Sequence, residues 1–248
     1  MMNNILIPTV HSLHWDNISK SILSSQKAVF DKLGIPLIQH KVDQKDHGEW
    51  MTEVTLKASD EEVIVFCDID AFPLNRAAYE DAVASARAGE IFGLAQFSAH
   101  VVNKNLYAGP MFLTFQKKTW VALGSPDLRG SAQSDAAAIL SIKARENGVP
   151  LRLIRPMCCI KSKWPLGSEG VFGIGTFYGS LDFFHLFESR YGSSIKLMKL
   201  VSMDVANGNA LNFSSYLDAV HANSFRAQLL EVVKYRIKSI WCNLIKIK

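Results

Sequence analysis

A run of six residues, Glu62–Cys67 (EVIVFC), does most to limit what this chain can fold into. After its first residue the run is β-branched and apolar and shows no polar alternation, which is typical of a strand covered on both faces in a parallel sheet. Parallel strands are joined by helical crossovers, so strands and helices should alternate along the chain. The run therefore predicts an α/β fold.

The remaining pattern of apolar residues fits this alternation. Strands are expected at residues 4–10, 36–42, 62–67, 90–96, 111–116, 150–155 and 181–187, and helices at 17–33, 51–58, 76–88 and 131–147, with a helical turn ending at residue 120. Residues 161–179 hold five glycines among aromatic residues, which favours an irregular binding loop or lid. We expect a mostly parallel, doubly wound sheet in one compact domain over residues 1–225, followed by a basic helical tail at 226–248.

Composition excludes several classes of protein. Of the 248 residues, 48% are hydrophobic and 20% are charged, so a disordered or fibrous chain is not expected. No run approaches the roughly 18 apolar residues that span a bilayer, and no basic segment precedes a long apolar run at the N-terminus, so no secretory signal is expected. The four cysteines show no C-x-x-C spacing, which argues against a disulfide framework or a zinc site. The expected location is the reducing cytoplasm.

The formal net charge of +4 is unevenly distributed. Residues 226–248 contain six basic residues and one acid, Glu231, so the tail carries the whole excess and the body is nearly neutral. A dispersed surface for nucleic acid is therefore a poor interpretation, and no nucleic-acid partner is expected. In the tail, apolar residues recur at helical spacing with Lys234 and Lys238 on the flank, which is typical of a helix lying on a membrane surface. A helix docked on the domain or in a dimer is the alternative.

Two acids follow the apolar strand, in the sequence Asp68-Ile69-Asp70. Alternate residues share a face of an extended chain, so both carboxylates can converge on one point at the carboxyl end of the strand, where open α/β sheets bind ligands. Two such acids repel each other unless a cation neutralises them, and hard oxygen ligands suit Mg²⁺ or Mn²⁺, which commonly hold phosphates as well. The alternative is that the pair only caps the turn.

An apolar strand that ends in D-x-D resembles the metal site of GT-A type nucleotide-sugar glycosyltransferases, which have a Rossmann-like fold. The resemblance implies that Asp68 and Asp70 hold Mn²⁺ or Mg²⁺ on the diphosphate of a nucleotide-sugar donor, with Asp68 also near the ribose. It implies transfer of a sugar to a hydroxyl of a glycan or lipid-linked acceptor. Such an acceptor fits attachment of the tail to the inner face of the membrane.

The resemblance extends to other residues. Tyr107 and Gly109, in the sequence YAGP, would contact the donor sugar, although a tight turn explains them equally well. Asp135 opens the Ala-rich helix and would be the general base, with Asp127 a weaker substitute; a helix cap is the alternative. His185 would complete the metal shell, although a lone histidine among aromatic residues is more often a core residue.

The remaining assignments concern the donor and acceptor. Arg190, Lys161 and Lys163 would offset the charge of the leaving diphosphate, although solvated surface is the more ordinary role for the two lysines. Thr9 and Val10, taken as the end of the first strand, would contact the nucleobase. Two tryptophans, Trp50 and Trp164, would line an acceptor groove or pack in the core. The spacings of His11, His14, His40 and His47 match no metal-binding helix motif.

Two other functions remain open at this stage. The sequence DIDAFPLN also resembles the nucleophile motif of haloacid-dehalogenase phosphatases, although that motif normally lies near the N-terminus and Ala71 replaces the usual Gly or Thr. A non-catalytic protein with a transferase-like fold, which binds glycan or scaffolds a membrane complex, is the third possibility. The sequence does not indicate which sugar, nucleotide or acceptor is used, nor whether the anomeric configuration is inverted.

Overall fold

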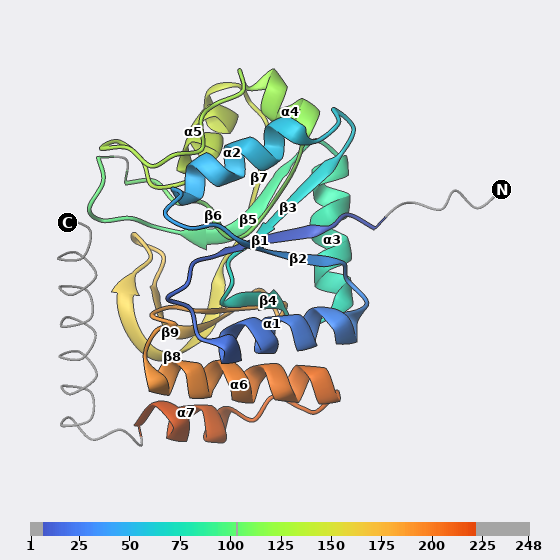
Figure 1. Cartoon of the computed structure of the whole chain (residues 1–248). Helices are drawn as coiled ribbons and strands as arrows, with labels where there is room; N and C mark the ends of the chain where they lie inside the picture. The colour runs from blue at the N-terminus through green and yellow to red at the C-terminus, as the bar shows by residue number, and fades with distance from the viewer. Residues whose placement is uncertain (1–6, 103, 222–248) are drawn as a thin grey trace, which may run out of the picture.

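A six-stranded sheet lies at the centre of the computed structural model, which describes residues 7–102 and 104–221 (Figure 1). Its strand order is β2-β1-β3-β6-β5-β7, and only β6 runs against the other five. The strands are β1 (Val10–His14), β2 (Leu37–Lys41), β3 (Val63–Cys67), β5 (Ile91–Gln96), β6 (Tyr107–Gln116) and β7 (Leu151–Ile154). The expected α/β fold with a mostly parallel sheet is confirmed.

Helices cover both faces of this sheet. One hydrophobic core joins it to α1 (Lys20–Leu33), α3 (Arg76–Arg87) and α6 (Gly192–Asn207), and a second core joins it to α2 (His47–Lys57), α4 (Lys117–Ala122) and α5 (Ala138–Glu146). A last helix, α7 (Phe213–His221), packs against α6. Every residue of β3 is buried between these layers, as its unbroken apolar sequence predicts.

Local sequence signals set the helix ends. The hydroxyl of Ser19 caps α1 by accepting from the amide of Ser21, and Gly34 ends it in the left-handed conformation at φ 64°. The side chain of Asp46 caps α2 in the same way through the amide of Glu49. Because α2 begins at His47 rather than at residue 51, it brings an extra turn toward the carboxyl end of β3.

A second, four-stranded sheet in the order β4-β10-β9-β8 corrects the expected loop at residues 161–179. It comprises β4 (Ala71–Pro73), β8 (Pro156–Pro165), β9 (Val171–Tyr178) and β10 (Phe183–Leu186). The glycines allow close packing: a Cβ on Gly173 would lie 2.3 Å from the carbonyl oxygen of Lys161 in the neighbouring strand, and one on Gly175 would lie 2.6 Å from Leu197 of α6. Most of the segment is therefore a β-hairpin rather than a lid.

Three other boundaries differ from expectation. The first strand begins at Val10, where the sequence predicted its end. Pro8 lacks the amide hydrogen that strand pairing needs, and the strand instead includes the polar residues His11 and Ser12. The YAGP segment lies within β6 rather than in a turn, opposite an irregularity between Gly93 and Leu94. Helix α5 begins at Ala138, seven residues later than predicted.

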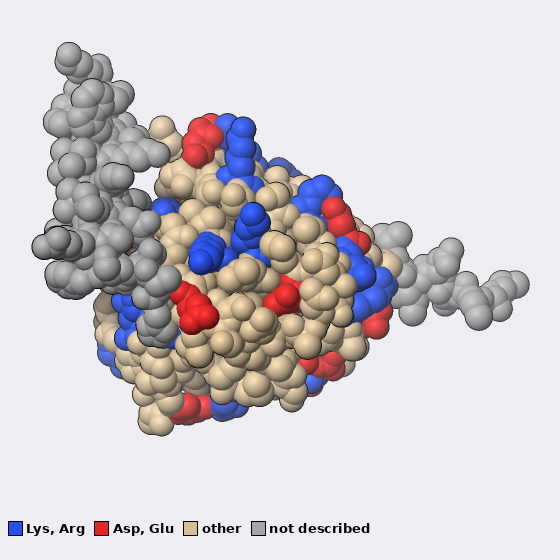
Figure 2. Space-filling view, turned by 90° about the horizontal axis from the view of Figure 1, so that it is seen from below, with Lys and Arg blue, Asp and Glu red and all other residues tan. Residues whose placement is uncertain are grey.

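Within residues 7–102 and 104–221, no helix has the length and apolar character needed to cross a bilayer. Seen from below, on the side of α6 and α7, basic and acidic side chains are interspersed among uncharged residues (Figure 2). The basic tail at 226–248 and the domain boundary at residue 225 lie outside the described residues, so both stay predictions.

Candidate active site

The acidic pair lies where the two sheets meet. Strand β3 ends at Cys67, Asp68 to Asp70 form a turn, and β4 continues from Ala71 into the second sheet. The amide of Asp68 donates to the carbonyl oxygen of Met111 at 3.2 Å, and the amide of Ala71 donates to that of Asp68 at 3.0 Å. The intervening Ile69 is buried in the core. Both carboxylates line a cleft between the two sheets, which is described below.

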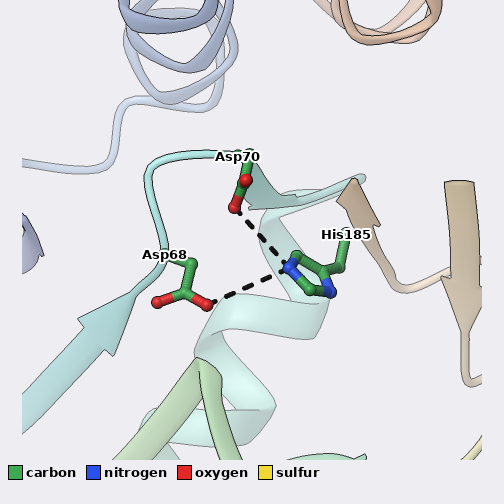
Figure 3. A group of neighbouring side chains, drawn as sticks. All are labelled: Asp68, Asp70 and His185. Atoms are coloured by element: carbon green, nitrogen blue, oxygen red, sulfur yellow. Dashed lines mark ion pairs between the residues drawn. The ribbon is translucent and has the colours of Figure 1, made fainter. Parts of the chain in front are cut away.

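Strand pairing brings His185 to the same place (Figure 3). In the antiparallel pair of β4 and β10, His185 lies opposite Ala71, and the amide of Leu186 donates to the carbonyl oxygen of Asp70 at 2.9 Å. The His185 Nε2 atom lies 3.6 Å from Asp70 Oδ1 and 3.9 Å from Asp68 Oδ2. The structure thus brings together the three residues that the sequence assigned to a metal, although His185 is more than a hundred positions from the two acids.

These three side chains fit a divalent cation. One ligand atom from each lies within 4.8 Å of the others, and two carboxylates with an imidazole form a donor set that suits Mn²⁺ or Mg²⁺. The ring nitrogen that faces both carboxylates is Nε2, whereas the buried Nδ1 atom, which has no hydrogen-bond partner among the described residues, points away from them (Figure 3). The geometry therefore favours a ligand over a packing residue.

The electrostatics of the pair point the same way. Burial raises the pKa of Asp68, and the negative charges of Asp70 and Asp135 raise it further, while His47 and His185 act against this shift. In the absence of a cation the site thus disfavours the ionised form of Asp68. A bound dication would reverse this preference by favouring both carboxylates in their charged state.

His47, which sequence reasoning set aside, belongs to this site. Its Nε2 atom lies 3.6 Å from Asp68 Oδ1, and its ring stacks on Trp50 at 5.8 Å and meets the edge of Trp15 at 6.5 Å. The side chain reaches Asp68 because it stands in the first turn of α2. No sequence spacing signals this contact, since it depends on how α2 lies across the sheet.

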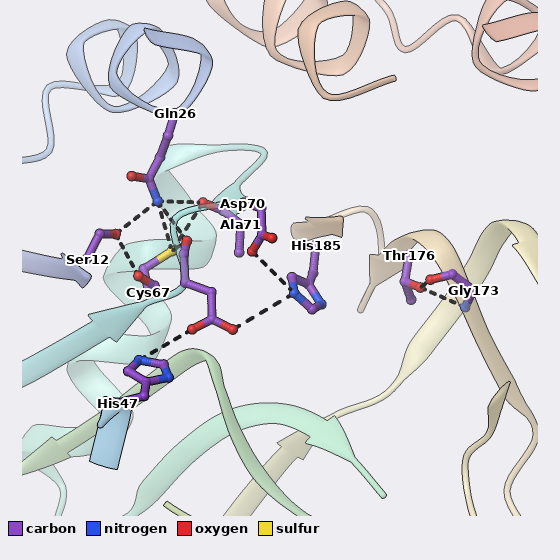
Figure 4. A network of polar contacts seen from close by, with 10 residues as sticks. Ser12, Gln26, His47, Cys67, Asp70, Ala71, Gly173, Thr176 and His185 are labelled. Carbon is purple, nitrogen blue, oxygen red and sulfur yellow. Dashed lines mark hydrogen bonds and ion pairs between the residues drawn. The ribbon is translucent and has the colours of Figure 1, made fainter. Parts of the chain in front are cut away.

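Gln26, another residue that the sequence did not single out, holds the acidic turn from behind (Figure 4). It is fully buried in α1, and its Nε2 donates to the carbonyl oxygens of Asp68 at 2.8 Å and Ala71 at 3.0 Å. It also contacts Ser12 Oγ at 3.0 Å, and Ser12 in turn donates to the carbonyl oxygen of Cys67 at 2.6 Å. This network fixes the backbone on both sides of Asp70.

Asp135 lies in the connection before α5, not within the start of the helix, where the sequence placed it. Its Oδ2 accepts hydrogen bonds from Ser98 Oγ at 2.7 Å and Tyr107 Oη at 3.0 Å, and its Oδ1 accepts from the amide of Ala136 at 3.0 Å. Burial and the charge of Asp135 hold the pKa of Tyr107 well above its usual range, so the phenol remains a donor. The two hydroxyls fix the orientation of the carboxylate.

A cleft of about 250 Å³ joins these groups. Asp68, Asp70 and His185 line one part of it, and Asp135 and Tyr107 line another. The cleft is also lined by His47, Gln96, Pro110, Met111, Ala136, Leu186, Phe187 and Glu188. None of these described lining residues is Lys or Arg, so positive charge opposite a bound anion would have to come from a metal or a histidine.

Other residues assigned from the sequence lie away from the cleft. Thr9 and Val10 lie at the amino end of the first strand rather than at its carboxyl end, and neither lines the cleft. Arg190 is exposed and also does not line it. A Cβ on Gly109 would lie 2.7 Å from Gln96 Oε1, so this glycine allows β6 to approach that side chain closely. Lys163 forms an ion pair with Glu188 at the margin of the cleft.

Similarity to known proteins is found in the fold and not in the sequence. No protein-family model matches the chain, and no curated protein sequence matches it. Similar solved structures include 4-diphosphocytidyl-2C-methyl-D-erythritol synthase from Anaerococcus prevotii, with 8% identity over 77% of this chain and 97% of that one and a TM-score of 0.45. A Bacillus anthracis protein designated a glucose-1-phosphate thymidylyltransferase, in complex with sucrose, has 9% identity over 80% and 98% of the chains, also at 0.45.

A third similar structure is that of A197 from STIV, with 11% identity over 60% of this chain and 82% of that one and a TM-score of 0.39. Likenesses this distant assign neither a substrate nor an activity to the chain. Any function must therefore be inferred from the residues of the cleft.

Proposed function

We propose that the protein is a divalent-metal-dependent glycosyltransferase that moves a sugar from a nucleotide-sugar donor to a hydroxyl of a glycan or glycolipid acceptor. The observation that carries the proposal is the convergence of Asp68, Asp70 and His185 in one cleft that also contains the oriented carboxylate of Asp135. The first three supply a place for a metal and a diphosphate, and the fourth supplies a base.

In this proposal Asp70 and His185 hold the cation, and Asp68 either shares it or binds the ribose. When bound, the metal would stabilise the negative charge that develops on the leaving nucleoside diphosphate. His47 lies beside Asp68 and offers a further donor to a phosphate oxygen. Because β1 ends at His14, we place the nucleobase near His14 and Trp15 rather than near Thr9 and Val10.

Asp135 would act as the general base. As the acceptor hydroxyl oxygen forms a bond to the anomeric carbon, its proton passes to the carboxylate, and the bond from that carbon to the diphosphate oxygen breaks with its electron pair leaving on the nucleotide. Ser98 and Tyr107 orient Asp135 through hydrogen bonds to Oδ2. This arrangement corresponds to transfer with inversion at the anomeric carbon.

A thermal-unfolding panel of nucleotide-sugars, each with and without Mn²⁺, tests the proposal. A ligand at 100 times its dissociation constant stabilises the folded state by about 2.7 kcal/mol, which corresponds to a rise of roughly 5–10 °C for a chain of this size. We expect at least one nucleotide-sugar to produce such a rise only when Mn²⁺ is present. Trapping of a phosphoenzyme at Asp68 would instead favour the phosphatase.

The variant Asp70→Asn sharpens this test because it removes a ligand while keeping the size of the side chain. We expect the Mn²⁺-dependent rise in unfolding temperature to disappear. Asp127→Asn is the matched control. Asp127 forms an ion pair with Arg129, does not line the cleft and is not one of the three residues of the metal group. If Asp70→Asn bound Mn²⁺ and nucleotide as the wild type does, a non-catalytic scaffold would be the better interpretation.

A further inference from the structure

A second pocket, of about 270 Å³, adjoins the metal cleft. The two hollows share three residues, Gln96, Asp135 and Phe187, so Asp135 lies at their junction. The volume is near the lower end of the range for small-molecule sites, which suits one ring rather than an extended chain. A molecule in this pocket would therefore present one of its atoms to Asp135, beside the proposed metal site.

The wall of the second pocket is largely aromatic. Trp164 from β8, Phe172 from β9 and Phe187 beyond β10 pack together with ring centroids 4.9 to 5.7 Å apart, and Phe97 contributes from the end of β5. Trp164, Phe187 and Phe97 are only partly buried, so parts of their rings remain accessible. Aromatic faces are negative and attract C–H groups that carry partial positive charge, as on the apolar face of a sugar ring.

The charges of the pocket favour an uncharged ligand over an anionic one. Among the described residues that line it, none is Lys or Arg, the one histidine, His100, is exposed to solvent, and the carboxylate of Asp135 is present. The nearby Lys163 is already engaged, because its ammonium group lies 4.8 Å from the centroid of the Trp164 ring and pairs with Glu188. A phosphate placed beside Asp135 would meet a carboxylate, and among the described lining residues only the exposed His100 could offset that repulsion, so an uncharged ligand is preferred.

The junction also has free hydrogen-bonding capacity. The buried Oε1 atom of Gln96 has no partner among the described residues, although Gln96 lines both hollows. A buried amide oxygen without a partner destabilises the site, and a hydroxyl donor from a ligand would remove that penalty. Asp135 and Gln96 Oε1 could thus accept hydrogen bonds from two hydroxyls of one ring.

We infer that this pocket binds an uncharged sugar ring, the terminal residue of the acceptor, with its apolar face on the aromatic wall and a hydroxyl at Asp135. The role of that ring as acceptor rests on the proposed function, whereas its binding does not. The inference narrows the substrate class: a neutral glycoside is accepted, and a sugar phosphate is not.

The binding experiment uses the full-length protein with saturating Mn²⁺ and UDP, GDP, CDP, ADP or dTDP, whichever binds in a Mn²⁺-dependent manner. The probes are methyl glycosides of glucose, galactose, mannose and N-acetylglucosamine, compared with glucose 1-phosphate and galactose 1-phosphate, by saturation-transfer NMR and titration. We expect at least one methyl glycoside to bind at least tenfold more tightly than either sugar phosphate. Tighter binding of a sugar phosphate, or no glycoside binding, would overturn the inference.

Ala99→Trp locates the bound ring. Ala99 lines the pocket and is exposed, so a larger side chain can fill the space without disturbing a core. We expect glycoside affinity to fall at least tenfold, while Ala28→Trp, the same change on the exposed face of α1, leaves it unaltered. Unfolding temperature verifies that both variants fold. Equal glycoside affinity in Ala99→Trp and wild type would place the ring elsewhere and overturn the inference.

Nucleotide binding separates the two claims. If no nucleoside diphosphate binds in a Mn²⁺-dependent manner, the proposed function fails; the glycoside titration, repeated without nucleotide, still decides whether the pocket binds a neutral ring. If nucleotide and Mn²⁺ bind but no glycoside does, the proposed function stands and only this inference fails.

Discussion

At the scale of single residues, the orientation of Asp135 is the feature that suits it to act as a base. A general base must be held in a fixed orientation and must also be within reach of the proton that it removes, and Asp135 meets the first requirement. Two hydroxyls donate to its Oδ2 atom, and the backbone amide of Ala136 donates to its Oδ1 atom. A carboxylate held by these hydrogen bonds has a fixed orientation at the junction of the metal cleft and the second pocket. Its loss should therefore affect proton transfer much more than donor binding.

We predict that Asp135→Asn lowers the rate of sugar transfer by about 10²- to 10⁴-fold, the usual contribution of a general base. The affinity for nucleotide with Mn²⁺ should change by no more than about threefold, because the amide retains the size of the carboxyl group. Steady-state transfer kinetics and calorimetric titration measure the two quantities. Asp127→Asn serves as control, and a loss of transfer in that variant instead would assign the base to Asp127.

The pair His11 and His40 gives a second prediction for single residues. His11 Nδ1 lies 3.0 Å from His40 Nε2, so one ring must donate to the other and both cannot be protonated in this arrangement. Burial, with a further contribution from His40, lowers the pKa of His11 to about 4, and burial lowers the pKa of His40 too. Charged groups from the surrounding elements face this pair: Lys45, Glu53, Lys57 and Glu62.

Because the pKa of His11 is lower in the folded state than its ordinary value of 6.5, the unfolded chain binds more protons between pH 6.5 and pH 4. The free energy of unfolding should therefore fall on acidification, by about 1–2 kcal/mol between pH 7.5 and pH 5 after allowance for partial exposure of the ring. Urea unfolding of wild type and His11→Asn measures this contribution as the difference between their pH slopes. Identical slopes would contradict it.

At the scale of secondary-structure elements, the acidic turn depends on α1. Gln26 is the contact through which this helix holds the carbonyl oxygens of Asp68 and Ala71. Two of the proposed metal ligands thus come from a turn fixed by α1, and the third comes from β10 through its pairing with β4. A change in α1 should therefore alter metal affinity although α1 supplies none of these three residues.

We predict that Gln26→Met lowers Mn²⁺ affinity by about tenfold, as loss of an outer partner of a metal site commonly does. It should also lower the free energy of unfolding by about 1–3 kcal/mol, since buried carbonyl oxygens lose a donor. Mn²⁺ titration and urea unfolding measure the two effects. Gln116→Met is the matched control, because Gln116 is also buried and donates to a backbone carbonyl oxygen, that of Glu61, but contacts neither Gln26 nor the turn; equal Mn²⁺ losses in both variants would contradict the prediction.

Elements whose signal is local could be predicted from the sequence, and those fixed by distant contacts could not. The C-terminal end of α1 and the buried strand β3 follow from Gly34 and an unbroken apolar run, whereas α1 begins at Lys20 rather than at the predicted residue 17. The loop predicted at residues 161–179 was wrong, because glycines such as Gly173 serve close strand packing rather than loop freedom. The first strand was misplaced because its polar residues are buried only by contacts with other elements, as when Ser12 donates to Cys67.

The same division holds for the candidate site. The Asp68 and Asp70 pair is visible as a spacing of two after a strand, and His185 was assigned by family resemblance. His47 and Gln26 could not be found, because each reaches the acidic turn from a separate helix. The charges expected to offset a diphosphate were misplaced, since Arg190 is exposed outside the cleft.

At the scale of the whole molecule, the basic residues of the sequence are concentrated in the tail and are missing from the described lining of the cleft. The cleft has no Lys or Arg among its described lining residues, while six basic residues occur in the last 23 positions of the chain. Basic residues beside an anionic surface contribute about 1 kcal/mol each to its attraction. We therefore propose that the tail brings the enzyme to a membrane that holds its acceptor.

We predict that full-length protein co-sediments with vesicles containing phosphatidylglycerol but not with pure phosphatidylcholine, and that salt weakens the binding because it screens surface charge. Lys234→Glu with Lys238→Glu should reduce the bound fraction severalfold, since the pair lies on one flank of the expected helix. Lys27→Glu with Lys32→Glu, on α1, is the charge-matched control and should bind like wild type. Equal binding by the tail variant and wild type, or by a chain ending at residue 225, would leave the basic tail without a role at the membrane.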